Sequence, residues 1–269
     1  MIFLKNSKFF IFSGISLLSV VVIRCIQIAF LINPQNGFFY ENYEGVGVLL
    51  TVMIIVITVI AALFTAFINV NKIDIMPKEN FGMGCVSLLL GLSQISELFM
   101  LNGTLEKVPA IIVILRTLFI LLSGISFCYL GIMYITKNKA NNICIITSVF
   151  CWIFRLVSTF ISFTGMSNIS DNLYDLLTLV STLVFLLFYS KYITGIKAKF
   201  HKNIVLISAT VAIIISAVSV LPKVVVALFG VTDFFDFHID SPVTSLFMTV
   251  YIAYYMVNVL ISQKGDVDK

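Results

Sequence analysis

The side chains best able to do chemistry in this sequence are charged or amide groups inside long apolar stretches. They are Arg24, Gln27, Gln94, Glu97, Arg116, Arg155, Asp175 and Lys223. A charge at the centre of a membrane helix costs about 2.5 to 3.5 kcal/mol on insertion scales, so each one needs a partner, water or a ligand. Arginine offers a planar set of donors and lysine a compact charge, and both suit a carboxylate or a phosphate. The pattern therefore indicates a binding site for an anion within a membrane.

The two acidic residues of this set predict specific ion pairs. Adjacent helices favour Glu97 with Arg116 and Asp175 with Arg155, which leaves Arg24 and Lys223 to attract an anion. The alternative is that these charges are structural, because ion pairs between neighbouring helices also hold a bundle together without any ligand.

The elements that carry these residues are membrane helices. The chain has 269 residues, of which 60% are hydrophobic and 11% charged, whereas a soluble domain has about 25% charged residues. A bilayer crossing needs about 20 apolar residues. Eight segments qualify, near residues 9–32, 45–68, 81–101, 108–135, 143–163, 173–194, 204–229 and 243–262. We therefore expect an all-α polytopic integral membrane bundle of eight helices, with residues 1–269 as one transmembrane domain and no soluble domain.

The basic residues of the connections predict the orientation. Lysines gather at both chain ends and in every second loop, whereas the opposite loops contain Lys107 alone. Basic residues near helix ends stay on the cytoplasmic side, so both termini are expected in the cytoplasm, and the expected location is the plasma membrane of a bacterial cell. All six intramembrane charges then fall in the outer half of the bundle. A site there would open outward.

Polar side chains at helical spacing predict a shared interior. Ser148, Cys151, Arg155, Ser158 and Ser162 alternate at three and four positions and therefore share one helix face. Comparable stripes in the other helices predict a single bundle with one common interior. The small residues in them also suit close helix packing.

Two further patterns concern the helices themselves. Pro222 is expected to interrupt its helix and to free a carbonyl beside Lys223, as in the broken helices of transporters. The separation in sequence between Arg24 and Arg155 is close to that between Pro109 and Pro242, and this similarity is compatible with two parallel halves of four helices.

Several functional classes find no support in the sequence. The five cysteines fall in or at the ends of predicted helices, and the two histidines fall on opposite sides of the membrane, so we expect no disulfide and no metal site. There is no basic groove for nucleic acid and no cofactor signature. Enzymatic acid–base or nucleophilic chemistry would fall to Glu97, Asp175 or Cys25, and none has a histidine partner in the membrane.

Two hypotheses for function follow. The first is transport or binding of a small anionic solute in an outward-facing cationic pocket of Arg24, Arg116, Arg155 and Lys223, oriented by Gln27, Gln94 and Glu97. The second is a non-catalytic membrane sensor or assembly partner with structural ion pairs. In that case the outer loop with Phe234, Phe235 and Phe237 would contact a membrane protein partner.

Overall fold

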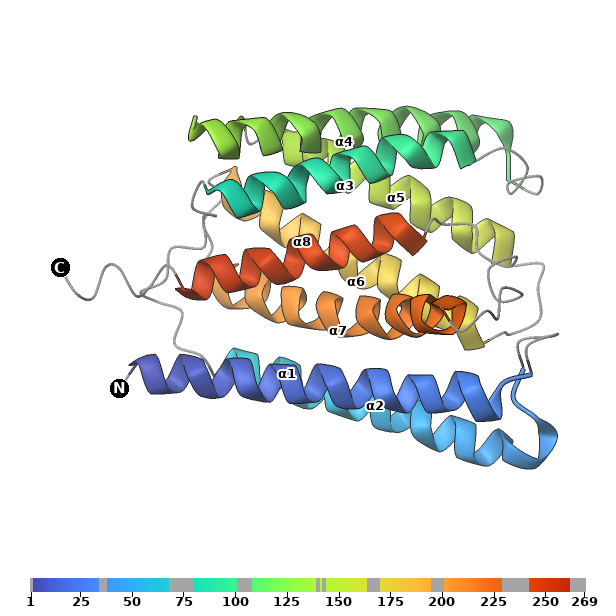
Figure 1. Cartoon of the computed structure of the whole chain (residues 1–269). Helices are drawn as coiled ribbons and strands as arrows, with labels where there is room; N and C mark the ends of the chain where they lie inside the picture. Colours follow the sequence, from blue (N-terminus) through green and yellow to red (C-terminus); the bar gives the residue numbers. More distant parts are fainter. Residues whose placement is uncertain are drawn as a thin grey trace.

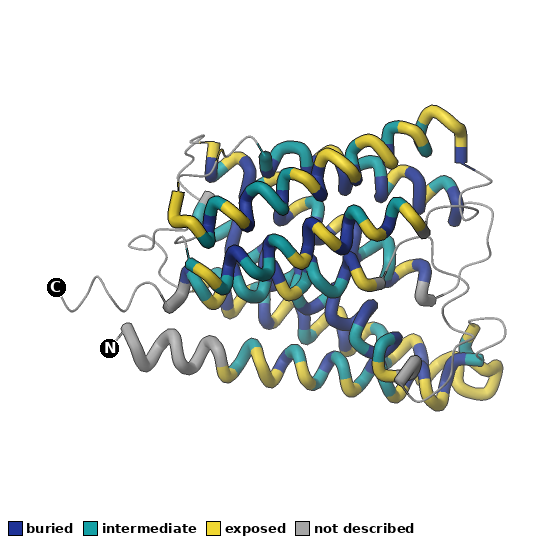
Figure 2. The backbone as a smooth tube through the Cα atoms, turned by 45° about the horizontal axis from the view of Figure 1, so that its top comes forward, coloured by how far each residue is buried: buried dark blue, intermediate teal, exposed yellow. Residues whose placement is uncertain are grey.

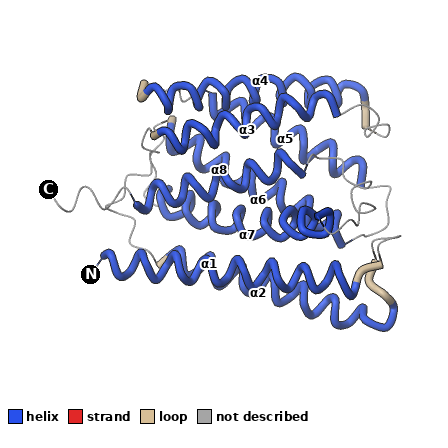
Figure 3. Tube along the Cα trace, in the orientation of Figure 1, coloured by secondary structure: helices blue, strands red, loops and turns tan. Residues whose placement is uncertain are grey.

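The described residues are helical almost throughout (Figure 3). The computed structural model describes residues 2–33, 38–67, 80–100, 108–138, 141, 144–163, 170–194, 201–228 and 242–261. Within these ranges the α-helices are α1 (Ile2–Ile26), α2 (Glu44–Ala66), α3 (Phe81–Met100), α4 (Ala110–Thr136), α5 (Cys144–Phe163), α6 (Ser170–Ile193), α7 (His201–Leu228) and α8 (Pro242–Ile261).

The helices are long and apolar enough to cross a bilayer. Among the described residues seven segments meet the length and hydropathy required, and α8 has a shorter apolar stretch, Val243–Val259. The outward surface is apolar as well, with Leu18 67% exposed and Ile111 68% exposed. Figure 2 shows such exposed residues along the outer sides of the helices and buried ones between them. Lipid suits this surface better than water does, so the predicted polytopic membrane bundle is confirmed.

Two details of the helices differ from the sequence-based expectation. Helix α1 begins at Ile2 rather than near residue 9, and it continues as one turn of π-helix over Gln27–Leu31. Helix α7 runs without a break through Pro222, so the predicted interruption is wrong. A proline costs one backbone hydrogen bond, and the flanking turns keep the helix intact because unpaired backbone groups are costly in hydrocarbon.

Helices α3 to α8 form a closed ring. Each packs against the next one in the chain, and α8 packs against α3. One cluster of buried apolar side chains spans the whole ring and includes Leu90, Phe127, Trp152, Phe185 and Tyr251. Any polar side chain that points into this ring is therefore surrounded by protein on all sides.

Helices α1 and α2 form a hairpin that lies outside the ring. They pack against each other and against α7 (Figure 1). A second, smaller apolar cluster holds them there, with Val20 from α1, Ile54 from α2, Tyr174 from α6 and Val218 from α7. The molecule thus consists of a six-helix ring with a two-helix hairpin along one side.

Glycines allow α3 and α4 to approach closely. A Cβ atom on Gly91 would lie 2.7 Å from the carbonyl oxygen of Gly124 and 2.6 Å from the sulfur of Cys128. A Cβ on Gly131 would lie 2.8 Å from the carbonyl oxygen of Gly84. This contact sets the register that brings the last turn of α3 beside the first turns of α4.

The two ends of the bundle are distinguished by the termini. Helix α1 begins and α8 ends at one end, which we call the near end. The opposite end, where α1 leads into α2, is called the far end. All six intramembrane charges lie in the half of the bundle toward the far end, because α1, α3, α5 and α7 end there while α4 and α6 begin there.

Candidate functional site

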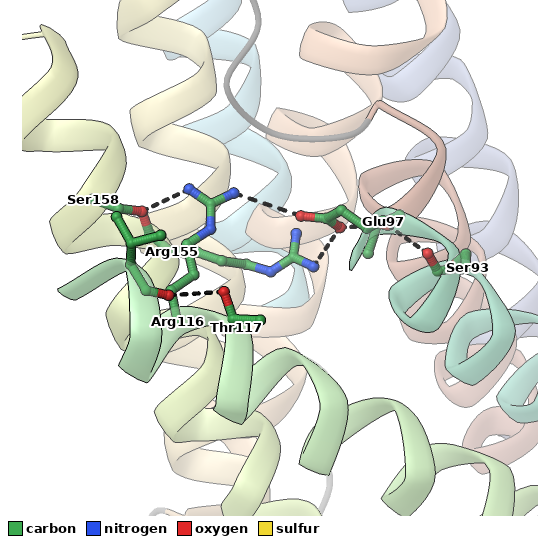
Figure 4. A network of polar contacts seen from close by, with 8 residues as sticks. Ser93, Glu97, Arg116, Thr117, Arg155 and Ser158 are labelled. Atoms are coloured by element: carbon green, nitrogen blue, oxygen red, sulfur yellow. Dashed lines mark hydrogen bonds and ion pairs between the residues drawn. The ribbon is translucent and has the colours of Figure 1, made fainter. Parts of the chain in front are cut away.

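Side chains from four helices gather at one carboxylate inside the ring, and Figure 4 shows Glu97, Arg116, Arg155 and Ser158 of this group. Glu97 Oε2 accepts hydrogen bonds from Arg155 Nη2 at 2.6 Å and from Thr244 Oγ1 at 2.8 Å. Glu97 Oε1 lies 3.5 Å from Arg116 Nη2. Arg116 Nη1 donates to Ser158 Oγ at 2.7 Å. We call Glu97, Arg116, Arg155, Ser158 and Thr244 the Glu97 cluster.

The charges of this cluster are fully enclosed. The side chains of Arg116 and Arg155 are 0% exposed and that of Glu97 is 3% exposed. Ionic attraction is strong in such a setting, and so is the cost of removing each charge from water. Two guanidinium groups share one carboxylate, so the three side chains carry a formal charge of +1. The predicted pair of Glu97 with Arg116 is confirmed, and Arg155 joins it.

Two buried polar side chains each precede a member of the Glu97 cluster by one turn of their own helix. Gln94 on α3 precedes Glu97 by three residues, and neither its Nε2 nor its Oε1 has a hydrogen-bond partner in the protein. Trp152 on α5 precedes Arg155 by three residues, and its Nε1 has no partner either. Both side chains are 0% exposed. Such atoms are normally satisfied by protein, water or a ligand.

A separate ion pair joins α6 to α7. Lys223 Nζ lies 2.7 Å from Asp175 Oδ1, and Ser219 Oγ donates to the same oxygen at 2.6 Å. The sequence predicted Arg155 as the partner of Asp175 and left Lys223 to attract an anion, and that expectation is wrong for Lys223. The physical reason is register, because α6 and α7 are antiparallel neighbours whose far-end turns face each other, while Arg155 reaches Glu97 inside the ring.

Arg24 and Gln27 belong to the hairpin rather than to the ring. Arg24 Nη1 donates to Gln27 Oε1 at 3.0 Å, and its guanidinium carbon lies 4.2 Å from the ring centroid of Tyr174. Gln27 Nε2 donates to the Gly47 carbonyl at 2.9 Å and to Thr51 Oγ1 at 3.1 Å. The expectation of one common interior for all helices is therefore wrong, since α1 and α2 turn their polar faces toward each other, α6 and α7.

A group of tyrosines lies in the same ring toward the near end. Tyr251 packs edge-on against Phe127 with centroids 5.3 Å apart, and Tyr189 packs against Tyr255 at 4.8 Å. The hydroxyls of Tyr189 and Tyr251 are buried and lie near each other within this group. Polar groups thus continue through the ring from the Glu97 cluster toward the near end, although the six intramembrane charges lie in the far half.

Several members of the site were not among the predicted site residues. Ser158 stood in the polar stripe of its helix, and this signal could have identified it. Thr244 follows Pro242 at the start of a helix, and Trp152 is the single tryptophan of the chain. Thr244 has no sequence signal that connects it to Glu97, because this contact depends on how α8 is turned within the ring. Trp152 lies beside Arg155, three residues later in the same helix.

The described residues show where the cysteines lie and whether His, Cys, Asp and Glu side chains gather. All five cysteines are free, and Cys151 is buried beside the Glu97 cluster on α5. Within the described ranges no group of three or more His, Cys, Asp and Glu side chains could hold a metal ion. The predicted outer loop lies outside the described residues, and with it Phe234, Phe235, Phe237 and His238.

Comparison of the chain with family models, with curated proteins and with solved structures gives no match. The geometry of the site therefore carries the functional argument.

Proposed function

We propose that the chain binds a small anionic solute at the Glu97 cluster and transports it across the membrane through the ring of α3 to α8. The observation that carries this proposal is the presence of two fully buried guanidinium groups around one carboxylate at the centre of a closed ring. Arginine binds carboxylates and phosphates through paired donors. Glu97 occupies the position that a solute carboxylate would take on either arginine.

Access to this site requires movement of the ring. Because Arg116 and Arg155 are 0% exposed, an anion reaches them only when neighbouring helices separate at the far end. Release toward the near end then follows a neutral route, for which Gln94, Tyr251 and Tyr189 supply polar groups. The described conformation corresponds to the closed state between these two openings.

Orientation and domain organisation are part of the same proposal. The lysine distribution favours a cytoplasmic near end, with both termini in the cytoplasm and the far end outside. Residues 1–269 would act as one transmembrane domain in the plasma membrane. In this arrangement Arg24 and Gln27 brace the α1–α2 hairpin, and Asp175 and Lys223 join α6 to α7.

The test is a binding experiment on the full chain purified in detergent. Thermal unfolding is measured with acetate, butyrate, inorganic phosphate and chloride for the unmodified chain, Arg155→Gln, Lys223→Gln and Thr117→Val. Arg155→Gln leaves one arginine with Glu97, so the formal charge of the cluster falls from +1 to zero and Glu97 keeps a partner. Thr117 is exposed on α4, which makes its variant the control for a change outside the site.

We expect one class of anion to stabilise the unmodified chain by about 2.7 kcal/mol at about 100 times its dissociation constant. That stabilisation should be lost in Arg155→Gln and kept in Lys223→Gln and Thr117→Val. Uptake of the same anion into proteoliposomes should follow this order. A flat response to every anion, or equal stabilisation of Arg155→Gln, contradicts the proposal.

The second candidate function is a non-catalytic membrane sensor or assembly partner whose charges are structural. The pairing of Lys223 with Asp175 at 2.7 Å favours it, because this pair needs no ligand. A flat anion panel together with capture of a stable membrane protein partner would support this candidate over transport.

A further inference from the structure

Gln94 and Trp152 have polar atoms that neither packing nor the Glu97 cluster uses. Both amide atoms of Gln94 and the indole nitrogen of Trp152 are buried without a hydrogen-bond partner. Leaving such groups unsatisfied in a protein interior is unfavourable. Gln94 needs at least one donor and one acceptor opposite it, whereas the Trp152 indole needs an acceptor.

These two side chains each precede a member of the Glu97 cluster by one turn of their own helix. Helices α3 and α5 both run toward the far end, and the side chains of Glu97 and Arg155 touch at 2.6 Å. Gln94 and Trp152 each precede one of these residues by three positions, which is a rise of about 4.5 Å. The guanidinium carbon of Arg155 also lies 5.2 Å from the ring centroid of Trp152. Trp152 therefore lies beside Arg155, and Gln94 lies one turn before Glu97 on α3.

We propose that Gln94 and Trp152 form a second subsite that binds a hydroxyl or carboxamide group of the transported solute. The solute is then an organic carboxylate of about four carbons, because Gln94 precedes Glu97, the partner of both arginines, by a rise of about 4.5 Å along α3. Its far-end carboxylate contacts Arg116 and Arg155, and its neutral polar group exchanges hydrogen bonds with Gln94 and accepts one from Trp152. This inference rests on the proposed transport of an anion and names the class of solute.

The chain provides its own spectroscopic probe of this subsite. Trp152 is the single tryptophan of the 269 residues, so tryptophan fluorescence reports on this position alone. The probes are butyrate, 4-hydroxybutyrate and succinamate, which share a carboxylate and a four-carbon chain and differ in the terminal group. Each is titrated into the detergent-purified full chain, and into Gln94→Leu, Arg155→Gln and Thr117→Val.

The expected result is tighter binding of 4-hydroxybutyrate or succinamate than of butyrate by roughly three- to tenfold, the effect of one or two additional hydrogen bonds. Gln94→Leu should bind all three probes like butyrate, and Thr117→Val should keep the preference. Trp152→Phe, measured by thermal unfolding, should weaken the preference, because the variant keeps an aromatic side chain and loses the indole donor.

Two results would overturn the inference, and they differ in whether anion binding is refuted as well. Equal binding of the three probes, or a preference that survives in Gln94→Leu, refutes the subsite and leaves anion binding in place. No response to any carboxylate, with Arg155→Gln behaving like the unmodified chain, refutes anion binding and the subsite together.

Discussion

The Glu97 carboxylate joins four helices at one point. Its oxygens lie within 3.5 Å of donors from α4, α5 and α8, while Glu97 itself belongs to α3. A charge pair in this position is costly to form and more costly to break, because removal of one partner leaves the others unbalanced in a medium of low dielectric. The contact between these four helices therefore depends on the single side chain of Glu97.

We predict that Glu97→Gln lowers the free energy of unfolding by about 3 to 5 kcal/mol, the usual effect of breaking a buried ion pair. Asp175→Asn should have a smaller effect, since the Asp175 side chain is 19% exposed and water can screen Lys223. Thermal unfolding of the two purified variants measures the difference. Equal destabilisation would show that the Glu97 cluster is no more important for stability than the pair on α6 and α7.

A second prediction concerns Ser158, the acceptor for Arg116. Ser158→Ala removes a hydrogen bond to a buried charge and should cost about 1.5 to 3 kcal/mol. Ser126→Ala removes a neutral acceptor, which receives a bond from Thr147 at 3.0 Å, and should cost about 0.5 to 1.5 kcal/mol. Unfolding midpoints of the two variants would contradict this order if Ser126→Ala were the less stable protein.

At the scale of elements, the contact between α3 and α4 holds the site in register. Gly91 and Gly124 let the two backbones approach closely enough that the last turn of α3 presents Glu97 to Arg116. Small residues at helix interfaces serve this purpose in membranes, where packing rather than the hydrophobic effect drives association. The distance between the helices and the geometry of the ion pair are therefore coupled.

Gly91→Ala tests this coupling. The added Cβ would lie 2.7 Å from a backbone oxygen, so the helices must separate, and we expect a loss of about 1 to 3 kcal/mol in the free energy of unfolding. Gly14→Ala is the matched control, because nothing lies within 4 Å of a Cβ at that position of α1. A Gly91→Ala protein as stable as Gly14→Ala would refute the close contact.

For the molecule as a whole, the ring closes on itself and the hairpin packs along its outside. The ring of α3 to α8 surrounds its polar groups, whereas α1 and α2 cover only one side of it, along α7. The termini share the near end (Figure 1), and the helix bounds place the intramembrane charges discussed above in the half toward the far end. A protein of this form is asymmetric across the bilayer, and its orientation decides which compartment the site serves.

Single cysteines at the two ends test the orientation. Tyr40 is 43% exposed at the far end, and Asn138 is exposed at the near end. We expect Tyr40→Cys to react with a membrane-impermeant maleimide in intact cells, and Asn138→Cys to react only after permeabilisation. The unmodified chain, with its five native cysteines, supplies the background. The reverse pattern would place the termini outside.

Sequence alone determined the membrane class, the eight helices and the identity of the buried charges, because hydropathy and the cost of charge in lipid act on each segment by itself. It also predicted the pair of Glu97 with Arg116, since α3 and α4 are neighbours in the chain. Contacts between side chains that lie far apart in the sequence could be determined only from the tertiary structure. Thr244 meets Glu97, and Arg24 stands apart from Arg155, because six helices close a ring and leave two outside it. Ring closure depends on the rotation and depth of every helix at once, and no local pattern records them.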